Sequence, residues 1–525
     1  MKLILMFAQA LIVARSLEAK TVITASDSSE ESRPSLETYM QERKHLIEKE
    51  QECFLGSKII LNEQETIVNK CLMKLKKREL DLGYKNSFNF IPARHFFEML
   101  DNINDSALFK FIRKLPKGGV LHAHDTALGG TDLIVNATYR ENLWQKGSFE
   151  DLEGPKFFFS RVSPGEGWQR VSDVRVGMTD VVYDAKIVDL FGLYDADPIN
   201  TYKSIDKVWQ KFQKMFFALE PLVTFEPVWR QYYYDSLLQF YDDNVHYLEF
   251  RGVLPNVYNM DGKIFNPEEV VEMYIEETER FKESHPAFLG AKLIYAPIRF
   301  CNDTVADTYL ETAVNLHLKF PNFVVGFDLV GQEDTGRPLI DFVPKLLDLP
   351  ASIQFFFHAG ETNWYGMNAD QNLVDAILLG TKRIGHGYAL VKHPHLLKEI
   401  KRRQICVEVN PISNQVLKLV QDQRNHPAAV FFSDDYPVVV SSDDPSFWRA
   451  SPLSHDFFIA FLGIASSRQD LRMLKQLAQN SIEYSAMVEA ERKLALKSWQ
   501  HYWDKAMHAL AEEIVQSRSE HGCEL

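Results

Sequence analysis

Short hydrophobic runs recur along the chain from residue 118 onward, and each is rich in β-branched or aromatic side chains. The runs are GGVLHAHDT from residue 118, VHYLEFRGV from 245, AKLIYAPIR from 291, VVGFDLVG from 324, IQFFFHAGE from 353, RIGHGYAL from 383, ICVEVNPIS from 405 and VVVSSDDP from 438. Segments with apolar residues at helical spacing, such as PEEVVEMYIEETERFKES, lie between them. Strands that alternate with helices in this way predict parallel pairing through crossover connections.

Eight such units predict an α/β fold, a (β/α)8 barrel of the TIM type. From the second run on, the runs start 46, 33, 29, 30, 22 and 33 residues apart, which is enough for one strand, one helix and short loops. The first gap, 245 minus 118 or 127 residues, is longer and predicts an insertion after strand 1 at about residues 136–185. An open, doubly wound sheet is the alternative, but no GxGxxG or P-loop motif follows any run.

The chain before the barrel divides into two parts. MKLILMFAQALIVARSLEA, residues 1–19, has the Lys, the apolar stretch and the small residues of a secretory signal peptide. Residues 20–112 are expected to hold a flexible Ser/Glu-rich lead-in and a charged helical extension that is either a helical hairpin packed on the main domain or a dimerisation element. The barrel is assigned to 113–510 and a C-terminal tail to 511–525.

Secretion is therefore the expectation, and it makes three Asn-x-Ser/Thr sequons candidate glycosylation sites, at Asn104, Asn136 and Asn302. The formal net charge is -14, from 72 acidic and 58 basic residues, and no long Lys/Arg run is present. This charge balance argues against a nucleic acid partner. The N-terminal apolar run is shorter than the roughly 20 residues that a membrane helix needs, so no stable membrane insertion is expected.

Polar residues gather where the predicted strands end, which is where parallel barrels place their active sites. His122 and His124 alternate at the end of strand 1, so both side chains face the same side. The other strand ends supply His358, Glu361, His386, Asp443 and Asp444. Three histidines and one aspartate form a nitrogen and oxygen donor set that suits a divalent ion such as zinc. A second His pair, in His393-Pro394-His395, is interpreted as a solvated helix entrance.

The motifs HAHD, HAGE, GHG and SSDDP, in this order, resemble the adenosine deaminase branch of the metal-dependent amidohydrolases. The secretory start, the helical extension, the insertion and the WQKFQKMF segment resemble its secreted subfamily, the adenosine deaminase-related growth factors. The resemblance implies one Zn²⁺ per subunit, Glu361 as proton donor and His386 as the base that faces the attacking water. The implied zinc ligands are His122, His124, His358 and Asp443, and the implied substrate contacts are Asp125, Trp209, Phe212, Gly331 and Asp444.

The chemistry of purine deamination requires these residue types. Zinc makes water a nucleophile at neutral pH, and an imidazole such as His386 can take a proton from that water. A carboxylic acid must face ring atom N1, and Glu361 fits if burial raises its pKa. Asp444 is free to face N7, and Gly331 lets a backbone N–H approach N3. Trp209 and Phe212 share a helical face with Phe216 that is either a stripe of core residues or a wall of the substrate site.

Three features qualify the resemblance. Ile298 precedes Arg299 where family members often have a His, which removes one expected contact on the ribose side. No cysteine lies between Cys71 and Cys301, so the disulfide expected within the insertion cannot form. Strand 4, VVGFDLVG, contains no Lys that could bridge two metal ions, which favours a single ion.

The sequence thus predicts a secreted adenosine deaminase that converts adenosine and 2′-deoxyadenosine to the inosine products and ammonia, and that forms a homodimer. One alternative is a growth factor that uses the barrel only as a scaffold and binds a cell-surface receptor or a glycosaminoglycan. Another is an amidohydrolase with a different substrate, such as adenine or a nucleotide. A nucleotide would need a phosphate clamp, and no Gly-rich cradle or basic cluster clearly provides one.

Overall fold

The structure is a computed structural model that describes residues 33–151 and 154–517. The chain splits into two compact units, Met1–Glu50 and Gln51–Leu525. The predicted signal peptide lies outside the described residues. The first unit contains most of helix α2, Leu36–Glu52, in which no residue is buried. The second unit contains all the other helices and strands of the described chain.

Eight parallel strand positions of the second unit form a closed ring, which confirms the predicted barrel. One row pairs β1 (Gly119–Val120), β5 (Tyr247–Gly252), β6 (Gly290–Tyr295), β7 (Val324–Phe327) and β8 (Gln354–Phe355), and the other pairs β9 (His358–Ala359), β10 (Arg383–His386), β11 (Cys406–Val409) and β12 (Val438–Val440). The fifth strand joins the rows because it runs from β8 into β9, and Lys382 N–H donates to the Phe355 carbonyl at 2.8 Å. A parallel bridge between Ala123 and Asp443 closes the ring.

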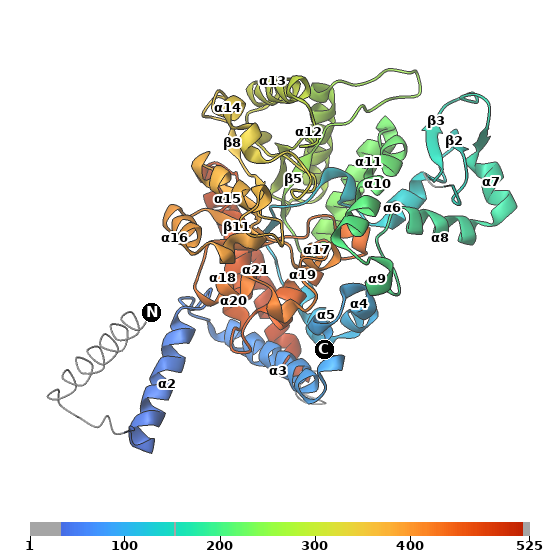
Figure 1. Cartoon of the computed structure of the whole chain (residues 1–525). Coiled ribbons are helices and arrows are strands. Elements are labelled where there is room, and N and C mark those ends of the chain that lie inside the picture. The colour runs from blue at the N-terminus through green and yellow to red at the C-terminus, as the bar shows by residue number, and fades with distance from the viewer. Residues whose placement is uncertain (1–32, 152–153, 518–525) are drawn as a thin grey trace, which may run out of the picture. The chain divides into compact units, whose positions relative to one another are not determined.

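Helices surround this ring (Figure 1). They are α11 (Glu226–Asp242), α12 (Pro267–Ser284), α13 (Asp303–Lys319), α14 (Val343–Leu346), α15 (Asn368–Leu378), α16 (Pro394–Arg403), α17 (Pro411–Val416), α18 (Ala428–Ser433), α19 (Ser454–Ile459), α20 (Leu471–Glu483) and α21 (Glu489–Ser517). Capping residues in the sequence mark where such helices begin. For example, Asn266 and Glu269 form a capping box that starts α12. Helix α21 continues past residue 510 and buries Ile514, so the tail expected from residue 511 is wrong as far as Ser517.

The extension after residue 62 packs on the barrel. It contains α3 (Glu63–Lys85), α4 (Phe96–Asp105) and α5 (Ala107–Arg113). The buried Glu65 carboxylate accepts hydrogen bonds from Lys475 Nζ at 2.6 Å and from Trp503 Nε1 at 2.7 Å. These partners belong to α20 and α21, which lie beside α3 in Figure 1. Helix α3 of the extension is therefore packed on the helices of the barrel.

The insertion forms a lobe beside the barrel, cyan in Figure 1, with a sheet and helices of its own. Its elements are α6 (Thr131–Ala137), β2 (Leu143–Lys146), β3 (Lys156–Phe159), β4 (Trp168–Arg170), α7 (Val171–Met178) and α8 (Asp180–Leu190), with the strands antiparallel in the order β3-β2-β4. Tyr183 is fully buried and donates to Gln145 Oε1 at 2.6 Å. Packing of this kind holds the lobe together without a disulfide. Helices α9 (Pro198–Thr201) and α10 (Ile205–Val223) follow it.

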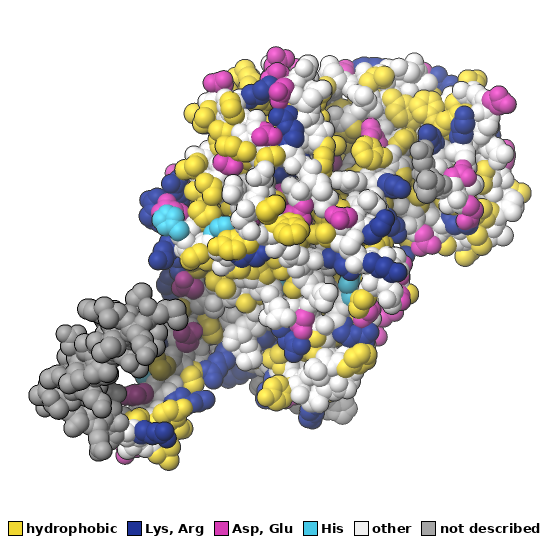
Figure 2. Space-filling view, in the orientation of Figure 1, with side chains coloured by type: hydrophobic (Ala, Val, Ile, Leu, Met, Phe, Trp, Pro, Cys, Tyr) yellow, Lys and Arg dark blue, Asp and Glu magenta, His cyan; other side chains and the backbone are white. Residues whose placement is uncertain are grey.

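The surface of the described chain carries mixed charge. On the face that Figure 2 draws, Lys and Arg side chains are interspersed with Asp and Glu side chains, with no large patch of either sign. Within residues 33–151 and 154–517, no helix is long and apolar enough to cross a membrane.

Candidate active site

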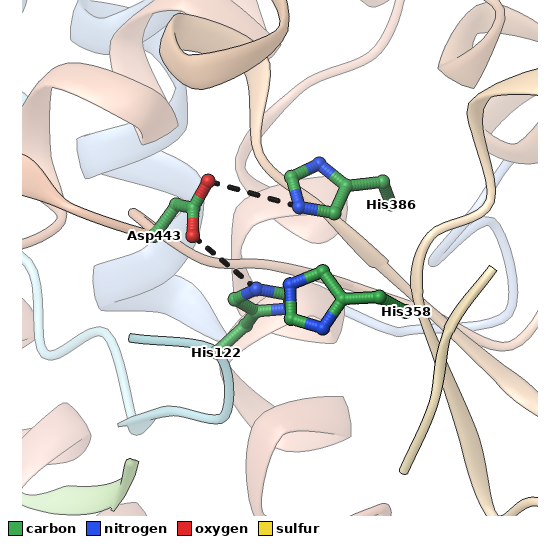
Figure 3. Close-up of side chains that lie close together, drawn as sticks. All are labelled: His122, His358, His386 and Asp443. Atoms are coloured by element: carbon green, nitrogen blue, oxygen red, sulfur yellow. Dashed lines mark ion pairs between the residues drawn. The ribbon is translucent and has the colours of Figure 1, made fainter. Parts of the chain in front are cut away.

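Four side chains from different strands converge at the carboxyl end of the barrel. His122 follows β1, His358 opens β9, His386 ends β10 and Asp443 follows β12, and all four are buried. Figure 3 shows them pointing toward one another. One ligand atom from each lies within 4.8 Å of those of the other three. Residues more than three hundred positions apart in sequence therefore meet around one point.

His124 joins this group through Asp443. His124 Nε2 lies 3.0 Å from Asp443 Oδ1, and His122 Nε2 lies 3.3 Å from the same oxygen. His386 Nε2 faces the other oxygen, Oδ2, at 3.7 Å. The structure thus brings together every residue that the sequence assigned to metal binding, with His386 on the opposite oxygen of the shared carboxylate.

Two further carboxylates orient the histidine rings. Glu408 Oε2 lies 2.7 Å from His122 Nδ1, and Asp328 Oδ2 lies 2.6 Å from His358 Nδ1. Each carboxylate accepts the Nδ1 proton and leaves the Nε2 lone pair of its ring free for an ion. The buried Nε2 of His122 has no hydrogen-bond partner in the described part of the chain. Zinc in proteins is commonly bound by imidazole nitrogens and carboxylate oxygens. The free Nε2 atom of His122 beside the Asp443 carboxylate therefore fits the ion.

A buried ion network supports the two carboxylates. Arg251 donates to Asp328 at 2.7 Å and to Glu408 at 2.8 Å, and Arg383 joins Glu408 to Glu249. Burial raises the pKa of Asp328 and of Glu408, but the positive charge of Arg251 and the hydrogen bonds from the histidine rings outweigh burial and hold both pKa values below the ordinary range. Both groups therefore remain carboxylates that accept hydrogen bonds from the histidines.

A cavity of about 450 Å³ opens onto the cluster. Its lining includes all five residues predicted to contact substrate, Asp125, Trp209, Phe212, Gly331 and Asp444, together with Glu361. Gln213, Phe217, Glu220, Phe300 and Tyr309 also line it and had not been predicted. Helix α10 supplies the aromatic wall, so the stripe of Trp209, Phe212 and Phe216 faces the cavity.

Glu361 is a buried carboxyl group that favours its protonated form. Burial raises its pKa well above the ordinary value, and the negative charges of Asp443 and Glu333 raise it further. Its Oε1 atom has no hydrogen-bond partner among residues 33–151 and 154–517, and it lies 3.5 Å from His386 Nδ1. Burial and Asp443 likewise raise the pKa of Asp444, and burial raises the pKa of Asp125 to about 7. The cavity thus holds carboxyl groups that can carry protons at neutral pH.

The backbone at Gly331 has a conformation that favours glycine. Its φ is +103°, and a Cβ atom there would lie 2.9 Å from the ring of Phe300. Ile298 also lines the cavity, so the position that lacks the expected His lies at the site. His393, by contrast, stands at the start of α16, where its Nε2 atom lies 2.9 Å from Asp370 Oδ2 of α15, and it lies outside the cavity lining.

Sequence reasoning missed the residues that hold the site in place. Asp328 and Glu408 were visible as charged residues within hydrophobic runs, VVGFDLVG and ICVEVNPIS, where a strand buried on both faces would carry apolar residues. Arg251 was visible in the same way within VHYLEFRGV. Asn414, whose Nδ2 lies 3.0 Å from His386 Nδ1, gave no such signal because NPISN is typical of a turn.

Comparison with known proteins identifies the family of the chain. The model of the adenosine deaminase family matches residues 194–500, and that of the adenosine/AMP deaminase N-terminal domain matches residues 16–112. A protein of Aedes albopictus named adenosine deaminase is 62% identical over 502 residues, which cover 95% of this chain and 94% of the relative. Adenosine deaminase 2 of Sus scrofa is 41% identical and covers 89% of this chain and 93% of the relative.

A solved structure shares the fold at low sequence identity. It is an amidohydrolase from Burkholderia ambifaria with bound Zn, with a TM-score of 0.53 and 19% identity, and the match covers 78% of this chain and 95% of that one. This likeness agrees with the barrel described above. On the family model and the relatives at 41% and 62% identity, the chain belongs to the adenosine deaminase family.

Proposed function

We propose that this chain hydrolyses adenosine and 2′-deoxyadenosine to inosine and 2′-deoxyinosine, and releases ammonia. The observation that carries the proposal is that His122, His358 and Asp443 meet in a buried cluster beside Glu361, a carboxyl group whose pKa is raised by burial. The cavity of about 450 Å³ in front of them is large enough for a small organic ligand. Relatives that share most of the chain carry the name adenosine deaminase.

One zinc ion per subunit would be held by His122, His124, His358 and Asp443. When bound, the ion supplies a nucleophile at neutral pH, because it lowers the pKa of water. His122 and His358, with the Nδ1 proton bonded to a carboxylate, would offer Nε2 to the ion, and His124 Nε2 lies 3.0 Å from Asp443 Oδ1. Asp328 and Glu408 would keep His358 and His122 in place as the ion binds.

The residues around the cavity would activate and hold the purine. Glu361 donates its proton to N1 as water adds to C6, which breaks the aromaticity of the ring. Asp444 faces N7, and the Gly331 backbone N–H approaches N3. Trp209 and Phe212 would contact the flat faces of the nucleoside, and Asp125, which accepts a hydrogen bond from Tyr274 at 3.0 Å, would contact its polar edge. His386 lies beside Asp443 Oδ2, where it faces the attacking oxygen.

An enzyme fits the site better than a growth factor that uses the barrel only as a scaffold, because every predicted ligand and the acid are present. A nucleotide substrate fits poorly. Arg251 is the one Arg or Lys of the described chain that lines the cavity, and its guanidinium already bonds Asp328 and Glu408. No cation is therefore available to a 5′-phosphate in this cavity of the described chain.

Secretion, glycosylation and assembly belong to the same proposal. The Asn side chains of the three sequons, Asn104, Asn136 and Asn302, are exposed, which glycosylation needs. Helix α2, with no buried residue, is the part of the extension that a homodimer would use. A receptor or glycosaminoglycan would be a second partner of an extracellular enzyme that also acts as a growth factor.

Loss of adenosine absorbance on incubation with the purified chain tests the activity. The proposal expects turnover by the wild type and none by Glu361→Gln. Adenine or AMP consumed faster than adenosine would contradict the proposed substrate.

A further inference from the structure

A chain of hydrogen bonds leads from the backbone to the ring of His386. The Ala428 backbone N–H donates to His426 Nδ1 at 3.0 Å. His426 Nε2 lies 2.9 Å from Asn414 Oδ1, and Asn414 Nδ2 lies 3.0 Å from His386 Nδ1. All three side chains are buried, so water does not compete for these bonds.

The direction of every bond in this chain follows from its first member. A backbone N–H can only donate, so His426 Nδ1 must be the acceptor. Burial lowers the pKa of His426 to about 3, and the neutral ring then carries its proton on Nε2. That proton needs an acceptor, which places the amide oxygen of Asn414 toward His426 and its NH₂ group toward His386. The opposite amide orientation would set two donors against each other at His426.

The last bond determines the proton of His386. Asn414 donates to Nδ1, so Nδ1 carries no proton and the neutral ring carries it on Nε2, the nitrogen 3.7 Å from Asp443 Oδ2. Glu361 Oε1, at 3.5 Å from the same Nδ1, is compatible with this state when Oε1 carries the carboxyl proton, because a hydroxyl group can donate toward an unprotonated ring nitrogen.

We propose that Ala428, His426 and Asn414 hold His386 in the resting enzyme as the tautomer protonated on Nε2, so that His386 donates a hydrogen bond toward the attacking oxygen. His426 and Asn414 are positioning residues in this scheme. The role expected from the sequence, a base at Nε2, is not available to that tautomer. A fixed donor at this place orients the oxygen and stabilises negative charge on it. The reaction itself rests on the proposed function, but the tautomer does not.

The tautomer is measured directly by nitrogen NMR of the full chain with ¹⁵N-labelled histidine and bound zinc. Comparison with His386→Gln assigns the two ring nitrogens of His386. The proposal expects an unprotonated Nδ1 and a protonated Nε2 in the wild type. In Asn414→Asp, a carboxylate that can only accept replaces the NH₂ donor, and the proton is expected to move to Nδ1. A wild-type ring already protonated on Nδ1 would overturn the proposal.

A matched pair of variants at His426 separates positioning from packing. Glutamine can still donate to Asn414, whereas phenylalanine keeps the ring shape without a donor. We expect kcat to fall at least about tenfold in His426→Phe, with little change in KM, and to be largely retained in His426→Gln. His455→Gln, at a buried histidine outside the cavity lining, is the control for loss of a buried ring.

Equal loss of kcat in both His426 variants, or an unchanged His386 tautomer in Asn414→Asp, would contradict the proposal. If Asn414→Asp does not fold, the wild-type spectrum still decides. A chain that shows the expected tautomer but consumes no adenosine would contradict the proposed function and leave the tautomer established.

Discussion

His386 and Asp443 both have left-handed backbone conformations, with φ of 62° and 60°, and their Nε2 and Oδ2 atoms lie 3.7 Å apart. Such conformations are costly for residues with a side chain and persist where the surrounding structure enforces them. Both residues stand at the carboxyl ends of strands, two strands apart in the ring. The turn at each strand end thus directs its side chain into the cluster.

Replacement of Glu361 by glutamine removes the proton donor and keeps the shape of the side chain. We expect kcat to fall by about 10² to 10⁴, the range of a positioned acid. The melting temperature should not fall, because the substitution removes a buried acid whose ionised form is unfavourable. Steady-state kinetics and thermal melts measure both. Unchanged kcat would exclude Glu361 as the donor.

The dependence of kcat/KM on pH follows from the same group. Burial and the charges of Asp443 and Glu333 raise the pKa of Glu361, and the proton donor must be in its acid form. Activity should therefore persist through neutral pH and decrease as pH rises through the raised pKa. A profile of kcat/KM from mildly acid to alkaline pH measures this. A decrease only toward acid pH, with no alkaline limb, would contradict the assignment.

Glu408→Gln should weaken zinc binding, because Glu408 orients His122 through the 2.7 Å bond to Nδ1. A loss of affinity of about 10- to 100-fold is expected, measured by titration of the metal-free chain with zinc. Glu249→Gln is the matched control, because Glu249 belongs to the same buried network through Arg383. Its carboxylate accepts from Arg383, Tyr247 and the Ala486 N–H, and from no histidine of the proposed zinc site in the described chain. If both variants lost the same zinc affinity, the loss would come from the buried network as a whole and not from the bond between Glu408 and His122.

Two N-terminal truncations should behave differently. A chain starting at residue 51 lacks only the first unit, so its melting temperature should match the wild type. A chain starting at residue 86 loses α3 and leaves Lys475 without its Glu65 partner, a change that costs about 3–5 kcal/mol for a buried pair. It should melt much lower or aggregate. Equal melting temperatures would show that α3 adds nothing to the barrel.

Light scattering of the chain that starts at residue 51 also tests the homodimer. A monomeric mass for this chain, beside a dimeric full-length protein, would assign assembly to the residues before 51. A dimer of both would place the interface elsewhere.

The barrel and the cluster of His and Asp side chains at its carboxyl end could be predicted, because both depend on the pattern of hydrophobic and polar residues within short segments. A strand buried on both faces appears as a hydrophobic run, and the polar residues that follow it, such as His122 and Asp443, must meet at one edge once the strands are parallel. The antiparallel sheet of the insertion could not be predicted, because the pairing of Leu143–Lys146 with Lys156–Phe159 depends on register and not on composition.

Contacts between distant segments were also beyond prediction. Glu65 looks like an ordinary charged residue on an exposed helix, and only the fold brings Lys475 and Trp503 to it. In the same way, His426 and Asn414 are typical loop and turn residues in sequence. Their relation to His386 appears only when three segments of chain pack together.

The most direct test of the account is an ultraviolet assay of adenosine consumption by the purified full-length chain, before and after removal of metal by a chelator and after zinc is added back. Turnover that is lost on chelation and restored by zinc is the predicted result. Turnover that continues in a chain shown by elemental analysis to be free of metal would contradict the claim that His122, His358 and Asp443 act through a bound ion.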